Sequence, residues 1–264
     1  MSQDLTPYVA LAEELADAAG AIARRYFRTR VAIDDKADQS PVTIADREAE
    51  SAMRAMIEKR FPEHGIIGEE HGVRNAGASH VWVLDPIDGT RSFVTGRPMF
   101  GALVALCRDG RPIVGVVDCP AMDERWIGAR GQPTRHRSRF SSETTVRVRD
   151  CPDLAKAAVY CTSPQMFDAD GFQRFERVRK ATRLILYGGD CYAYGLMSSG
   201  FADLVVEADL SGYDWAAIEP VIAGAGGSLT GWDGKPLDVT APKSRVLAVG
   251  DPKLLPQTVA LLQA

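Results

Sequence analysis

Two alternating hydrophobic periods restrict the fold more than any other feature of this chain. In the second half, apolar runs such as AAVYC and ADLVVEA are followed by segments with helical spacing, such as GFQRFERVRKA and CYAYGLMSSG. Short β-branched or aromatic runs favour strands, and a repeat near 3.6 residues favours a helix. Strands that alternate with helices predict α/β layers, with helices packed on sheets in two sub-regions.

The rest of the chain supplies further elements of both kinds. Helical stripes are predicted over 8–27 and 43–61, with a hairpin or loop at 31–42 between them. The runs VWVL, FGALVAL and PIVGVVD predict strands, as do SLTGW and RVLAVG. Residues 214–227 and 253–262 predict helices, and the polar, basic stretch 130–150 predicts a solvated connection rather than an exposed hairpin. We expect one compact unit with an α+β region over 1–140, which carries most of the acids discussed below, and an α/β region over 141–264.

Composition excludes several classes of protein. The 264 residues are 45% hydrophobic with a net charge of −4, which argues against general binding to nucleic acid or a membrane surface. No apolar run is long enough to cross a membrane, and the N-terminus lacks a secretion-signal pattern, so a cytoplasmic protein is expected. Five widely spaced cysteines without a CxxC pair predict reduced thiols. Four histidines without metal-ligand spacing are expected at the surface.

The stretch DPIDGT, which follows the apolar run VWVL, places Asp85 and Asp88 in a tight turn. Taken singly, the acids of this chain have ordinary explanations: a β-turn here, solvated side chains at Glu69 and Glu70, and a helix cap at Asp214. Asp46 follows Thr43 by three residues, which is the spacing of a capping box.

Taken together, the acids favour a metal site. Mg²⁺ prefers oxygen ligands, and a strand end can direct Asp85, the Ile87 carbonyl and Asp88 to one point. Gly89 and Thr90 then offer backbone N–H groups to a phosphate oxygen. Without a cation, the clustered carboxylates would repel one another and raise one another's pKa.

The chain resembles the inositol monophosphatase superfamily of Mg²⁺-dependent phosphatases over nearly its whole length. The resemblance rests on Lys36 and Asp46, then GEE, LDPIDGTRSF, GGDC, VVEADLSGYDWAA and GAGG, in that order. It implies a five-layer α-β-α-β-α sandwich, often a homodimer, that hydrolyses a small phosphate ester with two or three Mg²⁺ ions.

The resemblance also implies the roles of individual residues. The metal ligands would be Glu69, Asp85, the Ile87 carbonyl, Asp88 and Asp214. Asp46 and Thr90 would orient and activate the attacking water, and Glu70 would lie in the same acidic pocket. The residues expected to contact the substrate are Lys36, Gly89, Thr90, Arg91, Gly189, Asp190, Cys191 and Glu207.

The sequence around the last metal aspartate departs from the inositol pattern. Tyr213 precedes Asp214 where that pattern has Trp, and Arg91 and Ser92 follow DPIDGT. The stretch YGGDCYAYGLMSSGFADLVVEADLSGYDW resembles the histidinol-phosphate phosphatase branch, which implies histidine biosynthesis. Asp190 and Glu207 would face the cationic tail of that substrate, whereas myo-inositol offers only neutral hydroxyls.

Other interpretations stay open at this point. Asp190 could simply cap a helix, and Arg91 could contact phosphate or pair with a nearby acid. A broad inositol-type or polyol monophosphatase is the alternative enzyme, and a metal- and anion-binding module without turnover is the alternative outside enzymes. A nucleic-acid partner is not expected, because the one basic stretch carries a single aromatic residue, Phe140.

Overall fold

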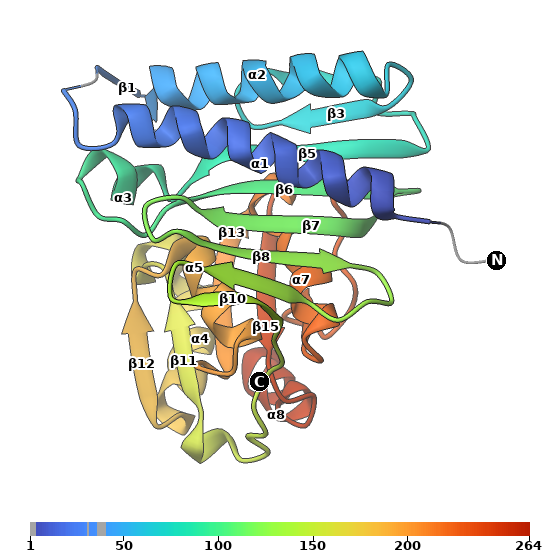
Figure 1. Cartoon of the computed structure of the whole chain (residues 1–264). Coiled ribbons are helices and arrows are strands. Elements are labelled where there is room, and N and C mark those ends of the chain that lie inside the picture. The colour runs from blue at the N-terminus through green and yellow to red at the C-terminus, as the bar shows by residue number, and fades with distance from the viewer. Residues whose placement is uncertain (1–3, 31, 36–40) are drawn as a thin grey trace.

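The computed structural model describes residues 4–30, 32–35 and 41–264 and contains five layers (Figure 1). Helices α1 (Thr6–Tyr26) and α2 (Ile44–Arg60) cover one face of an eight-stranded sheet, where α1 packs on β6 and β7 and α2 on β5. Helices α5 (Asp190–Ser198), α6 (Gly212–Trp215) and α7 (Ile218–Gly224) lie between this sheet and a five-stranded sheet. Helices α4 (Ala169–Ala181) and α8 (Leu254–Gln263) pack together on the outer face of the second sheet. The predicted layer order is therefore confirmed.

The first sheet has the order β10-β9-β8-β7-β6-β5-β3-β4 and is antiparallel except for the pair β3·β5. Its strands are β3 (Gly65–Gly68), β4 (Gly72–Arg74), β5 (His80–Asp88), β6 (Gly101–Arg108), β7 (Arg111–Cys119), β8 (Glu124–Ala129), β9 (Arg135–Ser138) and β10 (Ser141–Thr145). In Figure 1 its central strands run across the view.

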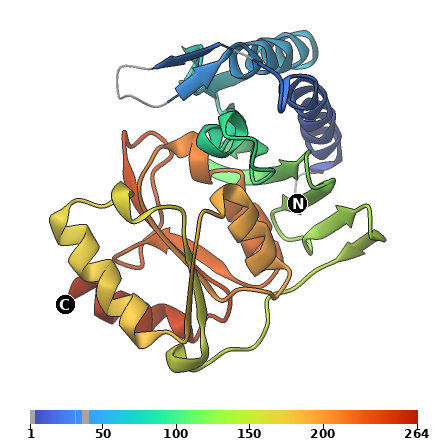
Figure 2. The ribbon, with the colours of Figure 1, turned by 90° about the vertical axis from the view of Figure 1, so that its left-hand side faces the viewer.

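The second sheet has the order β12-β11-β13-β15-β14 and stands upright in the same view. Its strands are β11 (Ala158–Cys161), β12 (Leu184–Tyr187), β13 (Leu204–Leu210), β14 (Ser228–Gly231) and β15 (Ser244–Val249). The remaining elements are the hairpin β1 (Ile33–Asp35) and β2 (Pro41–Thr43), helix α3 (Thr90–Val94), and the 3₁₀ turns η1 (Leu154–Lys156) and η2 (Pro164–Met166). Figure 2 shows α1 and α2 at one end of the molecule and the C-terminus at the other.

Three differences from the sequence predictions concern secondary structure. The stretch 130–150, expected as a solvated connection, contains the hairpin β9–β10 at the edge of the first sheet. The predicted helix over 214–227 is divided into α6 and α7, because Pro220 has no N–H to donate to the carbonyl of Ala216. Strands β3, β4 and β8 were not predicted. Since β10 ends at Thr145, the first sheet extends past the boundary expected at 140, and the division into two regions stays a prediction.

His64 corrects the expectation of four surface histidines. It is buried, accepts a hydrogen bond from Trp82 Nε1 at 3.1 Å through its Nδ1, and stacks on Phe61 with 4.6 Å between ring centroids. Burial lowers the pKa of His64, so the neutral ring accepts the hydrogen bond from Trp82. All five cysteines are buried and unpaired.

One hydrophobic cluster joins the two sheets through the middle layer. It includes Leu103 and Val117 of the first sheet, Ile218 and Val221 of α7, and Val246 of the second sheet. Apolar burial on both faces of α7 therefore fixes the two sheets relative to each other. No helix in the described ranges has the length and apolarity needed to cross a membrane.

Close approach of the middle layer to the first sheet depends on Gly115. A Cβ at this position would lie 2.0 Å from the carbonyl oxygen of Ala217, which no rotamer change can relieve. We expect Gly115→Ala to lower the free energy of unfolding by about 1–3 kcal/mol, measured by denaturant titration. Gly77→Ala is the matched control, because nothing lies within 4 Å of a Cβ there. Equal stability of the two variants would contradict this packing argument.

Candidate active site

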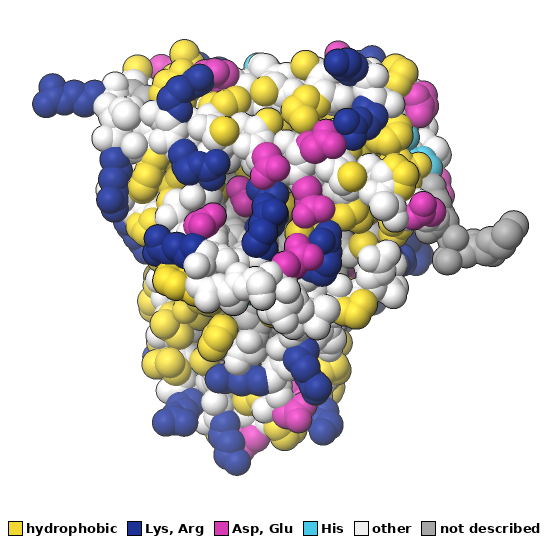
Figure 3. Space-filling model, in the orientation of Figure 1, with side chains coloured by type: hydrophobic (Ala, Val, Ile, Leu, Met, Phe, Trp, Pro, Cys, Tyr) yellow, Lys and Arg dark blue, Asp and Glu magenta, His cyan; other side chains and the backbone are white. Residues whose placement is uncertain are grey.

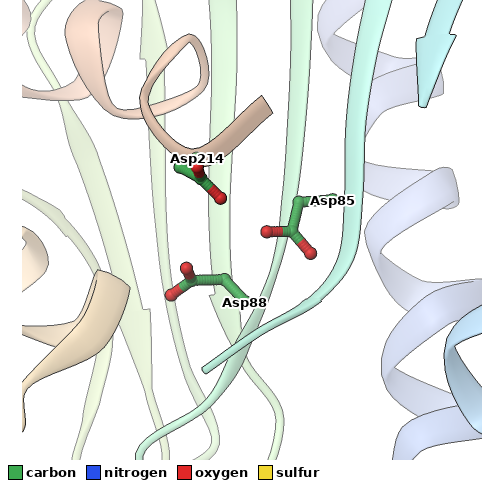
Figure 4. Close-up of side chains that lie close together, drawn as sticks. All are labelled: Asp85, Asp88 and Asp214. Carbon is green, nitrogen blue, oxygen red and sulfur yellow. The ribbon is translucent and has the colours of Figure 1, made fainter. Parts of the chain in front are cut away.

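Strand β5 ends with two acids that a regular strand would direct to opposite faces. Asp85 and Asp88 are three residues apart, and successive side chains alternate across a strand. The pairing of β5 with β6 shifts register between these two residues. The Ile87 N–H donates to Asp85 Oδ1 at 3.1 Å within the resulting turn. This irregularity places both carboxylates on the same side, as Figure 4 shows.

Asp214 meets these acids from the other half of the chain (Figure 4). It is the third residue of the short helix α6, and its Oδ2 accepts the Ser211 N–H at 2.6 Å in a capping box. Ser211 is thus the N-cap, where the sequence had suggested Asp214. One ligand oxygen from each of Asp85, Asp88 and Asp214 lies within 4.8 Å of the others. Three carboxylates therefore converge at the junction of the two halves.

Glu69 adds a fourth acid through the parallel pairing of β3 with β5. Gly68 pairs with Leu84, and the Glu69 N–H donates to the Leu84 carbonyl at 3.2 Å, so Glu69 follows β3 beside Asp85. Its charge raises the pKa of both Asp85 and Asp214. The carboxyl ends of two parallel strands thus supply acids to one edge of the sheet.

Burial and mutual repulsion dominate the electrostatics of this cluster. Burial first, and then the neighbouring carboxylates, raise the pKa of Asp85 and Asp88 well above their usual range. Burial and Glu69 raise the pKa of Asp214 to about 7, against a smaller opposing effect of Lys243. Hard oxygen donors that repel one another without a countercharge fit a divalent cation such as Mg²⁺.

Asp46 is both a helix cap and a buried acid close to the cluster. Its Oδ2 accepts the Thr43 N–H at 2.8 Å and the Thr43 hydroxyl at 2.6 Å, which completes the predicted capping box. Its Oδ1 is buried and has no hydrogen-bond partner among the described residues. Burial raises the pKa of Asp46, and the charge of Glu69 adds to this rise. The cap occupies one oxygen and leaves the other for a further ligand.

The turn after β5 contains Ile87, Gly89 and Thr90, whose predicted roles toward metal and phosphate stay predictions. Gly89 has φ +79° and is the N-cap of α3, which Thr90 begins. The Thr90 hydroxyl donates to the Ile87 carbonyl at 3.1 Å. Within the described ranges no hydrogen bond joins Thr90 to Asp46, so their action as a pair stays a prediction.

Glu70 is oriented by an acid that the sequence did not single out. Glu50 of α2 is fully buried, and its carboxylate accepts the N–H groups of Glu70 at 2.7 Å and His71 at 3.1 Å. Arg54 Nε pairs with the same carboxylate at 2.7 Å. An acid beside Ala49 and Met53 in the apolar stripe of α2 is the sequence signal that could have identified it.

A hollow of about 120 Å³ adjoins the acidic cluster. Its lining includes Asp88, Asp214, Asp190, Cys191 and Glu207. The carboxylate of Glu207 is 3% exposed and accepts the Thr162 N–H at 2.9 Å and the Tyr194 hydroxyl at 2.8 Å. The predicted acids Asp190 and Glu207 therefore do lie around one pocket, and Thr162 and Tyr194 are contributors that the sequence reasoning missed.

The remaining predicted contacts differ in their surroundings. Gly189 is the buried N-cap of α5, and the Cys191 N–H donates to Asp88 Oδ2 at 2.7 Å. Asp190 begins α5, but its carboxylate accepts from Ser92 Oγ and makes no side-chain cap. Arg91 is exposed, and its charge lowers the pKa of Asp190 only slightly against the effect of burial. Lys36 lies outside the described residues.

The chain is similar in sequence and in fold to known proteins. Residues 4–264 match the family model described as the inositol monophosphatase family. A chloroplastic relative from Arabidopsis thaliana called bifunctional phosphatase IMPL2 is 45% identical over 98% of this chain and 76% of its own length. A histidinol-phosphatase from Mycobacterium tuberculosis is 37% identical over 85% of this chain and 87% of its own length.

A solved structure of an inositol monophosphatase from Zymomonas mobilis superimposes with a TM-score of 0.89. The two sequences are 43% identical, and the match covers 100% of both chains.

The raised pKa values predict a pH-dependent effect of metal on stability. Between the ordinary value of 3.8 and about 7, the folded metal-free protein retains the Asp214 proton that the unfolded chain has lost. Its free energy of unfolding should therefore fall as pH rises through this interval. A cation replaces the proton, so the increase in Tm on adding Mg²⁺ should grow from pH 5 to pH 8. Asp88→Asn should reduce this dependence, and an increase that is equal at both pH values would contradict it.

Asp46→Asn tests whether the unpartnered oxygen acts on the reaction. Asn retains an acceptor for Thr43, so the free energy of unfolding should fall by no more than about 1–2 kcal/mol. If Oδ1 orients the attacking water, kcat should fall by about 100-fold. Asp168→Asn is the control, because Asp168 caps α4 through the Gly171 N–H at 2.6 Å. An unchanged kcat in Asp46→Asn would show that Asp46 only caps the helix and does not orient the attacking water.

Proposed function

This chain belongs to the inositol monophosphatase family, and from that premise we propose that it is a Mg²⁺-dependent phosphatase whose substrate is L-histidinol phosphate. Membership makes it a hydrolase of phosphomonoesters. The observation that carries the choice of substrate is the pair of acids around the hollow, Asp190 and Glu207. Relatives called histidinol-phosphatase support it, including that of Mycobacterium tuberculosis.

One set of residues would act on the phosphate and another set would bind the leaving group. Glu69, Asp85, Asp88, Asp214 and the Ile87 carbonyl would hold two or three cations. When bound, Mg²⁺ would offset the charge of the phosphate and lower the pKa of an attacking water.

Asp46 Oδ1, buried and without a partner, is the atom that would accept the proton of that water. Its own burial-raised pKa makes it a better base than an exposed aspartate. The Thr90 hydroxyl, which donates to the Ile87 carbonyl, would bind the same water as an acceptor. The Gly89 and Thr90 N–H groups would bind a phosphate oxygen.

The acids of the hollow would bind the leaving alcohol rather than the phosphate. Histidinol carries an ammonium group and an imidazole, and both are cations when protonated. Burial raises the pKa of Asp190 and of Glu207, which means that each charged carboxylate is poorly solvated. A cationic tail would supply a positive charge beside both carboxylates, whereas the hydroxyls of a polyol would supply only hydrogen bonds.

An inositol or polyol monophosphatase is the second candidate. The solved structure from Zymomonas mobilis, 43% identical, is described as an inositol monophosphatase. Glu207 already accepts two hydrogen bonds, and in that role it could equally accept a sugar hydroxyl. Direct comparison of the two esters separates these candidates.

We also propose that the enzyme is a homodimer. Strand β12 lies at the edge of the second sheet, with Leu184 and Tyr187 half exposed. A second copy covering this edge would bury both side chains.

We do not propose a nucleic-acid partner. Figure 3 shows acidic side chains among the basic ones on the face in view, which is unlike a basic binding groove.

Glu207→Gln tests the proposed substrate. The variant replaces an acceptor of two donors by an amide and removes the charge that would meet the cationic tail. We expect kcat/KM for histidinol phosphate to fall by about 10-fold or more, with little change for glycerol 2-phosphate, whose alcohol is neutral.

The control for this test is Asp209→Asn. Asp209 lies on the same strand as Glu207, but it is exposed and forms an ion pair with Lys243. Preference of the unaltered protein for inositol 1-phosphate, or an equal loss on both esters in Glu207→Gln, would reject the histidinol assignment.

A further inference from the structure

The turn that leads into α5 is held by two side chains for which the proposed reaction has no role. Arg97 Nη2 donates to the Gly188 carbonyl at 3.0 Å, and Ser92 Oγ donates to Asp190 Oδ2 at 2.8 Å. The two donors belong to one closed segment, because the Arg97 N–H donates to the Ser92 carbonyl at 2.8 Å. We call Ser92 and Arg97 the clamp. It joins the segment after DPIDGT to a turn that lies almost 100 residues further along the chain.

Asp190 has a conformation that needs such support. Its φ is +45°, in the left-handed region where a residue with a Cβ is strained. Gly188, two residues earlier, has φ +78°, and a Cβ there would lie 2.7 Å from Arg97 Nη2. On the other side, a Cβ at Gly89 would lie 3.0 Å from Asp190 Cγ. Arg97 thus packs closely on Gly188, and the Asp190 side chain packs closely on Gly89, so these contacts limit how the turn and its carboxylate can move.

The clamp holds a different part of the turn from the one that meets the acidic cluster. The Cys191 N–H donates to Asp88 Oδ2 at 2.7 Å, and the Asp190 N–H donates to Thr162 Oγ1 at 3.2 Å. Neither bond involves Arg97 or Ser92. Loss of the Arg97 side chain should therefore free the Gly188 carbonyl and loosen the turn that carries Asp190, while the contact with Asp88 persists.

We propose that Arg97, together with Ser92, is a positioning residue that fixes the Asp190 carboxylate toward the hollow and so determines selectivity for a cationic leaving group. This inference rests on the proposed function, since it assigns Asp190 to the tail of histidinol phosphate. Arg97 itself is exposed and contacts the turn from outside, so it acts through Asp190.

The charge of Arg97, taken alone, predicts the opposite effect on the binding of a cationic ester. A guanidinium close to Asp190 opposes the binding of a cation to the same carboxylate. If charge were its whole effect, removing Arg97 would strengthen the binding of a cationic ester. If Arg97 acts as a positioning residue, its removal weakens that binding. The direction of the change in KM therefore separates the two effects.

The test compares Arg97→Ala, Arg97→Gln and Arg28→Ala, each with histidinol phosphate and with glycerol 2-phosphate. In Arg97→Ala we expect KM for histidinol phosphate to rise about 10-fold, the size of one lost charge-assisted hydrogen bond, with kcat and both constants for glycerol 2-phosphate unchanged. Arg97→Gln keeps an N–H donor without the charge and should restore KM to within about threefold. Arg28→Ala is the matched control, because Arg28 Nε donates to the Gly96 carbonyl at 3.0 Å on the same segment but does not contact the turn.

Two further measurements keep this inference separate from the choice of substrate. Amide hydrogen exchange over residues 188–191 should be faster in Arg97→Ala than in the unaltered protein, with no substrate present. In an Asp190→Asn background, Arg97→Ala should cause no additional rise in KM.

Unchanged exchange, a lower KM for histidinol phosphate, or an equal rise in KM for both esters would overturn the clamp. If exchange becomes faster but the unaltered protein prefers inositol 1-phosphate, the clamp stands and the proposed substrate is wrong.

Discussion

Repulsion among buried carboxylates is the constraint on which the rest of the structure depends. Asp85 and Asp88 lie at the end of strand β5 of the first sheet, and Asp214 lies in the short helix α6 of the middle layer. One oxygen of each of these carboxylates lies within 4.8 Å of the other two. Such a group is unfavourable unless protons or a cation offset its charge. The core that α7 shares with both sheets must therefore supply the stability that this group lacks.

Helix capping and chemistry are not alternatives at this site. Asp46 and Asp214 are both the third residue of a capping box, with Thr43 and Ser211 as the respective N-caps. The backbone N–H that each carboxylate accepts fixes its rotamer. For Asp46, this leaves a second oxygen that is buried and unpartnered. A local signal that predicts only a helix start thus also orients an acid toward the cluster.

Local sequence was sufficient for the long helices, most central strands and the acids of DPIDGT. It was insufficient where tertiary contacts decide. The polar strands β9 and β10 have no apolar alternation, because their side chains lie half buried or exposed at the edge of the sheet. Glu50 and Arg97 were missed for a related reason: the backbone groups that they bind, the Glu70 N–H and the Gly188 carbonyl, lie 20 and 91 residues away in sequence, and only the folded chain brings them together.

The turn 188–191 places Asp190, the residue proposed to determine selectivity, next to Cys191, which contacts the acidic cluster. The Gly188 carbonyl accepts a hydrogen bond from Arg97, and the Asp190 carboxylate accepts one from Ser92. The next residue, Cys191, donates its N–H to Asp88. The positive φ of Asp190 reverses the chain between these contacts, so that its carboxylate and the next N–H serve two neighbouring sites. Under the proposed role of Asp190, a change of leaving group would require new side chains on this turn, whereas the acids proposed to hold the cations could stay the same.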